Sequence, residues 1–91
     1  MSLSQTKFIL FSFENQQEAT DAYDRIKDLK NSRLIPLPPE IDKGCGLCLR
    51  INQEDFDKVY KIFKDENISF SKIYTFVHEN FKRKIKEYVF W

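Results

Sequence analysis

The spacing of apolar residues changes along the chain, and each change predicts a new element. Thr6–Phe13 is a short apolar run rich in β-forming residues and predicts a buried strand. Asn15 followed by Glu18 is a variant of the capping box, so we expect a helix to begin there and to run over residues 16–30. The apolar residues at helical spacing in this helix are Ala19, Ala22, Tyr23, Ile26 and Leu29.

Two short strands follow the helix. Arg33–Leu37 predicts a strand that lies at a sheet edge or ends early, because Pro36 has no backbone N–H to donate. After a loop that contains Pro38 and Pro39, Gly46–Ile51 predicts the next strand. The two faces of this strand would carry Leu47, Leu49 and Ile51 on one side and Cys48 and Arg50 on the other.

A second helix and a fourth strand complete the pattern. Asn52 followed by Asp55 predicts the start of the helix, and Asn67 predicts its end. Ser69–Val77 then predicts the strand. The buried stripe of the second helix would consist of Phe56, Val59, Tyr60 and Phe63.

The element order β-α-β-β-α-β predicts an α+β domain of the ferredoxin-like kind. Such a domain has a four-stranded antiparallel sheet with both helices on one face, which leaves the opposite face open. We therefore expect this domain over residues 1–77, followed by a tail over residues 78–91.

The tail predicts a short amphipathic helix. Its apolar residues at helical spacing are Phe81, Ile85, Tyr88 and Val89. The polar side is basic, and basic amphipathic helices can lie on membrane surfaces. We favour the alternative in which the tail covers the open sheet face of its own domain or of a partner subunit, and we expect no membrane partner.

Composition adds limits to this picture. Among 91 residues, 42% are hydrophobic and nine are Phe, which predicts one soluble domain with a packed core. The 15 Lys and Arg residues oppose 14 Asp and Glu residues, so no global field would attract nucleic acid. The sequence lacks a signal-peptide pattern and an apolar run long enough to span a bilayer, so we expect a cytoplasmic protein.

All of the glycines and cysteines of the chain lie within the stretch Gly44–Cys48. Because glycine permits positive φ and close approach, Gly44 and Gly46 would present Cys45 on an accessible loop. Lys43 and Arg50 are nearby cations, which would lower the pKa of the thiol because they favour the thiolate. The stretch therefore predicts a reactive thiol at Cys45.

Three other roles for the cysteines stay open. A structural zinc site needs four ligands, whereas Cys45, Cys48 and His78 supply three, so only a dimer could complete one, and we expect neither a metal nor a cofactor. A thioredoxin-like pair belongs where a strand leads into a helix, but this pair leads into a strand. In the third role both cysteines pack as small apolar side chains, and the glycines serve only a turn.

The same stretch also has the spacing of the RNA-recognition signature on the third strand of the appropriate element order. That signature uses aromatic side chains to stack bases. Cys45, Leu47 and Arg50 occupy its three aromatic positions here. We therefore expect no nucleic-acid partner and keep RNA binding as a minor alternative.

One sequence pattern covers about residues 6–76. An Ile-Pro-x-Pro strand end is followed by a short loop and by Gly-Cys-Gly before an apolar strand that ends in a basic residue. The segments that carry it are Phe8–Phe11, Arg33–Pro36 with Pro38, Gly44–Arg50 and Ile68–Tyr74. With these segments the chain resembles the selenium/sulfur carrier-like family of small bacterial proteins, and Cys45 matches the central cysteine of that family.

This resemblance implies a carrier protein rather than an enzyme. Cys45 would hold a sulfur or selenium atom as a persulfide-type adduct, received from a donor protein and passed to an acceptor protein, with Cys48 as a candidate resolving thiol. The surrounding binding residues would be Lys43, Gly44, Gly46 and Arg50. The alternative is an interaction or regulatory module with buried cysteines, and we also expect a small homo-oligomer such as a homodimer.

Overall fold

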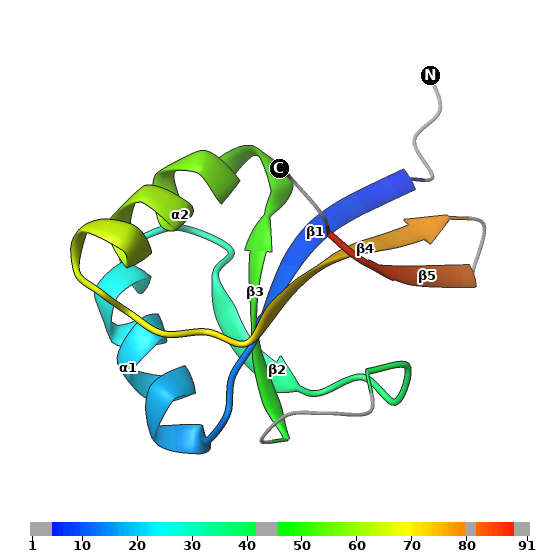
Figure 1. Cartoon of the computed structure of the whole chain (residues 1–91). Helices are drawn as coiled ribbons and strands as arrows, with labels where there is room; N and C mark the ends of the chain where they lie inside the picture. The colour runs from blue at the N-terminus through cyan, green and yellow to red at the C-terminus, as the bar shows by residue number, and fades with distance from the viewer. Residues whose placement is uncertain (1–4, 42–45, 80–81, 89–91) are drawn as a thin grey trace.

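A computed structural model describes residues 5–41, 46–79 and 82–88 of the chain. These residues form one antiparallel sheet of five strands in the order β2-β3-β1-β4-β5, together with two α-helices (Figure 1). The elements are β1 (Gln5–Ser12), α1 (Gln16–Ile26), β2 (Arg33–Pro36), β3 (Leu47–Asn52), the 3-10 turn η1 (Gln53–Asp55), α2 (Phe56–Asp65), β4 (Lys72–Glu79) and β5 (Lys82–Glu87). The predicted α+β class and antiparallel sheet are confirmed, whereas the predicted count of four strands is wrong.

Both helices cover the same face of the sheet, as predicted (Figure 1). Phe11 lies at the centre of this layer and is fully buried. Its ring meets the rings of Phe63 and Phe70 edge to face, with 5.1 Å between centroids in each pair, a geometry that aromatic rings favour. The buried residues of the layer are Ile9, Phe11, Phe13, Ala19, Ala22, Ile26, Leu49, Ile51, Val59, Phe63 and Ile73.

The two helices begin in different ways. At α1 the predicted cap forms as a variant of the capping box: the Asn15 Oδ1 atom accepts the Glu18 N–H at 2.9 Å, and Glu18 Oε1 accepts the N–H of Glu14, the residue before the N-cap, at 3.3 Å. At α2, Asn52 and Asp55 stand at N-cap positions, but neither side chain makes a capping hydrogen bond within the described chain. The 3-10 turn η1 leads into α2 instead.

The predicted helix in the tail is wrong. Lys82–Glu87 forms β5, which pairs with β4 so that Glu79 lies opposite Lys82 and Tyr74 lies opposite Glu87. Ile85 is the one apolar residue of this strand, and a single apolar residue fits a strand as well as a helix. Pairing with β4 satisfies the backbone groups along one side of β5. The tail therefore widens the sheet, and the expected boundary after residue 77 falls inside β4.

The segment that follows β2 covers part of the sheet face opposite the helices. Ile41 is only 4% exposed and packs with Leu10 and Cys48 in a second buried cluster. Arg83 of β5 holds this segment from the other edge of the sheet, because its guanidinium donates to both carboxylate oxygens of Glu40 at 2.9 and 3.0 Å. The half-buried residues around the cluster are Ile35, Leu37, Tyr74, Phe76 and Ile85.

Neither described helix could cross a membrane, since each lacks the necessary length and apolar character.

Candidate functional site

The structure describes three of the six predicted site residues. Gly46, Cys48 and Arg50 lie at or along β3. Lys43, Gly44 and Cys45 fall in the stretch 42–45, which lies outside the described residues. The described part of the candidate site therefore consists of the residues on either side of that stretch.

Both flanks of the stretch 42–45 are fixed to the sheet. On one side, Ile41 is buried in the second cluster, and its N–H donates to the Pro38 carbonyl at 2.9 Å. On the other side, the Leu37 N–H donates to the Gly46 carbonyl at 2.9 Å. This bond continues the β2–β3 ladder beyond the Pro36–Leu47 pair. Residues 42–45 thus follow a buried residue, Ile41, and precede a residue that is hydrogen-bonded to Leu37 at the end of the β2–β3 ladder.

Gly46 has the backbone conformation that favours glycine. Its φ angle is +94°, in the region that L side chains rarely adopt. Apart from its chain neighbours, no heavy atom of the described residues lies within 4 Å of the place where a Cβ would stand, so the requirement for glycine that the structure shows is conformational. The surroundings of Gly46 are open, and the residue itself is exposed.

Cys48 lies inside the second cluster. The residue is 0% exposed and packs with Leu10 and Ile41 on the sheet face opposite the helices. The predicted division of β3 is confirmed, because Leu49 and Ile51 pack on the helix side instead. A cysteine in such surroundings packs as a small apolar side chain. The role of Cys48 as a resolving thiol stays a prediction.

Arg50 lies farther along β3 from the cysteine stretch. With a rise of about 3.3 Å per residue, the four steps from Gly46 to Arg50 cover roughly 13 Å, which exceeds the Debye length of about 8–10 Å in physiological salt. The Arg50 side chain stacks on Phe8, with 4.4 Å from its Cζ atom to the ring centroid. Arg50 therefore lies far along β3 from Gly46, the residue that follows Cys45, whereas Lys43 is closer to Cys45 in sequence.

The register of the sheet reveals a feature that the sequence pattern missed. Arg33 on β2 lies directly opposite Arg50 on β3. Burial, and then the positive charge of Arg33, lower the pKa of the Arg50 guanidinium. The one signal of this contact in the sequence was the alternation of side chains along β3. It places Arg50 on the sheet face opposite the helices, but it cannot show that Arg33 lies across from it.

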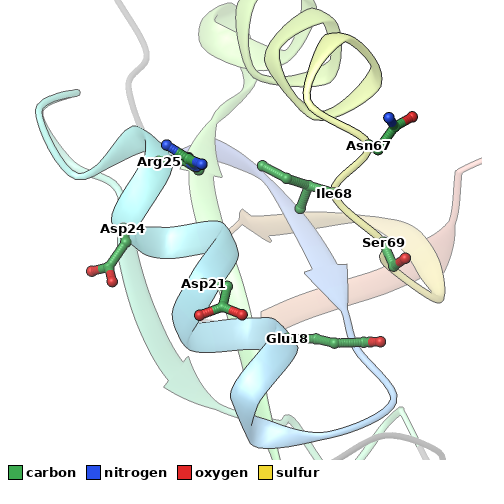
Figure 2. A pocket seen from close by; sticks show the side chains of 7 residues that line it. All are labelled: Glu18, Asp21, Asp24, Arg25, Asn67, Ile68 and Ser69. Atoms are coloured by element: carbon green, nitrogen blue, oxygen red, sulfur yellow. The ribbon is translucent and has the colours of Figure 1, made fainter.

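A polar groove lies on the helix side of the molecule. Figure 2 shows the side chains of α1 along one wall and those of the segment between α2 and β4 along the other. Arg25 in this groove pairs with Glu66, with 3.0 Å between Nε and Oε1. The lining residues are Glu18, Asp21, Asp24, Arg25, Asn67, Ile68 and Ser69. Among the described residues, no group of three or more His, Cys, Asp or Glu side chains could hold a metal ion.

Comparison with known families adds to this geometry. Residues 8–75 match the family model described as "Putative Se/S carrier protein-like". The chain belongs to this Se/S carrier-like family. The matched range runs from within β1 to the middle of β4 and includes the stretch that contains Cys45, so the family assignment expected from the sequence is confirmed.

A curated relative of this Se/S carrier-like chain is the "Putative sulfur carrier protein" of Aquifex aeolicus. The two are 37% identical over 86 residues, which cover 91% of this chain. The same match covers 39% of the relative, so this chain spans well under half of the length of that protein. No solved structure matches the chain.

Proposed function

We propose that the chain carries a sulfur or selenium atom on the Cys45 thiol and hands it to a partner protein. The observation that carries this proposal is membership of the Se/S carrier-like family over residues 8–75, a range that includes Cys45. The name of the Aquifex aeolicus relative, a sulfur carrier, agrees with it. A donor protein and an acceptor protein are therefore part of the proposal.

The transfer step is an exchange between a thiolate and a persulfide. The Cys45 thiolate attacks the outer sulfur of the donor's persulfide, and a new S–S bond forms at Cys45. The S–S bond of the donor breaks, and its inner sulfur leaves as a thiolate with the electron pair. The outer sulfur moves with its proton from one persulfide to another. Its oxidation state does not change, so no external oxidant or reductant is needed. The acceptor's thiolate repeats this step on the Cys45 persulfide and regenerates the Cys45 thiolate.

Two features of the described residues suit such a carrier. Ile41 and the Leu37–Gly46 hydrogen bond fix the chain on both sides of residues 42–45, so the thiol would be presented from a defined place on the domain. The open space around Gly46 would allow a second protein to approach the backbone. Lys43 would favour the thiolate form of Cys45, and Arg50 would contribute less because it lies farther along β3.

We also propose a ferredoxin-like fold type and a cytoplasmic location for the chain. The order β2-β3-β1-β4 with two helices on one face suits a ferredoxin-like domain that has gained β5 at one edge. Cytoplasmic residence suits a carrier thiol, because reducing systems keep cysteines there in the thiol form. A homodimer stays a prediction.

Mass spectrometry of the intact chain tests the carrier role. After incubation with a cysteine desulfurase and cysteine, the wild-type chain should gain the mass of one sulfur atom. Cys45→Ser should not gain it, and Cys48→Ala should gain it as the wild type does. An adduct that persists on Cys45→Ser, or no adduct on the wild type, would contradict the proposal.

The second candidate is an interaction module whose cysteines only pack in the core. The burial of Cys48 favours this role for that residue. A thiol reagent under native conditions separates the two candidates at Cys45. If Cys45 in Cys48→Ala reacts as slowly as Cys48 in Cys45→Ser, the interaction module is the better description.

A further inference from the structure

Two arginines face each other across β2 and β3 on the sheet face opposite the helices. Arg33 and Arg50 are direct cross-strand partners, and such partners have Cβ atoms about 4.5–5.5 Å apart. Two positive charges in this arrangement repel each other and destabilise the sheet. Arg33 is exposed, so the pair opens to solvent on the β2 side.

The surroundings of Arg50 make this repulsion harder to relieve. Its guanidinium lies over the Phe8 ring, which in turn meets Phe76 edge to face at 6.1 Å. The Nε atom of Arg50 is buried and has no hydrogen-bond partner among the residues that the structure describes. A buried donor without an acceptor is costly, and native structures usually supply a partner from protein, water or ligand. The Nε–H group is thus a donor with unused capacity beside a second guanidinium.

The other arginines of the described chain are paired. Arg25 meets Glu66, and Arg83 meets Glu40 with two hydrogen bonds. Neither Arg33 nor Arg50 has a carboxylate partner among the residues that the structure describes. The unpaired arginines are therefore the two that stand opposite each other.

We propose that Arg33 and Arg50 bind an oxyanion, a carboxylate or phosphate group, on the open face of the sheet. The anion accepts N–H groups from both guanidinium groups, and its charge turns the repulsion between them into attraction to both. Arginine suits this role because its planar, fork-shaped donors match such oxygens. The group comes either from a small solute or from an acidic side chain of a partner protein. This site goes beyond the proposed carrier function, because it uses neither cysteine.

Nitrogen-15 NMR of the Arg50 side chain provides a direct test on the whole wild-type chain. Inorganic phosphate, added at constant ionic strength, should shift the Arg50 Nε–Hε resonance along a saturating curve. Arg33→Gln should weaken the apparent affinity about tenfold or more, because it removes a charged hydrogen-bond donor. Arg25→Gln is the matched control on the helix side and should leave the affinity unchanged.

Thermal unfolding provides a second readout that does not require an Arg50 variant. Phosphate should raise the melting temperature of the wild type relative to an equal ionic strength of chloride, since a ligand that binds only the folded state stabilises it. Without phosphate, Arg33→Gln should raise the melting temperature, because it removes one of two positive charges that repel each other across β2 and β3. Cys45→Ser should respond to phosphate as the wild type does, so failure of this site and failure of the carrier role are distinguishable.

A titration with tetraglutamate identifies the source of the anion. A saturating shift with phosphate alone indicates a small solute, and one with tetraglutamate alone indicates an acidic partner. The absence of a saturating shift with either probe would overturn the proposal, as would equal affinities for the wild type and Arg33→Gln.

Discussion

The two faces of the sheet are built from different kinds of residue. On the helix side, aromatic and aliphatic side chains form one continuous buried layer around Phe11. On the other side, Ile41 belongs to a small buried cluster, and the two positively charged residues Arg33 and Arg50 lie next to this cluster. Among the described residues, the helix side contains most of the buried apolar residues, and the other side contains the residues of the proposed anion site.

This contrast separates stability from function within one sheet. The residues of β3 alternate between the two layers, so Leu49 serves the core while Cys48 and Arg50 face the other way. The stretch that contains Cys45 follows Ile41, which belongs to the side with fewer buried residues. Substitutions on the helix side should therefore reduce stability most, whereas those on the other side should change reactivity or binding more.

Replacement of Phe11 should have the largest effect. Phe11→Ala removes a fully buried ring that contacts Phe63 and Phe70, and we expect a loss of about 3–5 kcal/mol in the free energy of unfolding. Phe8→Ala is the matched control on the open face. Because Phe8 is only half-buried, its loss should be about 1–2 kcal/mol. Urea unfolding measures both, and equal losses would contradict the contrast between the faces.

Replacement of Ile41 should have an intermediate effect on stability and a specific effect on Cys48. Ile41→Ala should cost about 2–4 kcal/mol, because it removes a buried side chain. It should also speed the reaction of Cys48 with a thiol reagent, measured in a Cys45→Ser background, since Ile41 packs against Cys48.

Ile26→Ala is the control for this second effect. Ile26 is 2% exposed and Ile41 is 4% exposed, so the two are similarly buried. Ile26, however, lies on the helix side. Its replacement should lower stability at least as much as that of Ile41, without exposing Cys48 in the folded state. If both variants speed the labelling of Cys48 equally, the reaction reports global unfolding, and Ile41 is not a specific cover.

The features that could be predicted from the sequence are those that depend on neighbouring residues. The cap at Asn15 and Glu18 involves residues within one helical turn, and it forms as expected. The alternation in β3 also follows from local geometry, so the different faces of Cys48 and Leu49 were predictable. The central cysteine of the family pattern was likewise readable from a short motif.

The features that could not be predicted depend on pairing between distant segments. The spacing of apolar residues in the tail fits a helix, but the partner of Lys82–Glu87 is β4, and a local pattern does not contain that pairing. The contact between Arg33 and Arg50 depends on the register of two strands joined by a loop. The bond from Arg83 to Glu40 joins residues 43 positions apart.

The ion pair of Glu40 and Arg83 should have the smallest effect, and it should depend on pH. A backbone hydrogen bond, and then the hydrogen bonds from Arg83, hold the pKa of Glu40 below its ordinary value of 4.5. A carboxylate with a lowered pKa stabilises the fold above its unfolded value, and this contribution is lost as the pH falls through the folded value. The difference in stability between the wild type and Glu40→Gln should therefore be constant near neutral pH and disappear in acid.

Urea unfolding between neutral and acidic pH measures this difference. Arg83→Gln is the control: without the guanidinium, the part of the pH dependence that Arg83 contributes should be lost, and the part that the backbone hydrogen bond of Glu40 contributes should remain. Parallel stability curves for the wild type and Glu40→Gln over the whole range would show that Arg83 does not hold the segment before the cysteine stretch through this carboxylate.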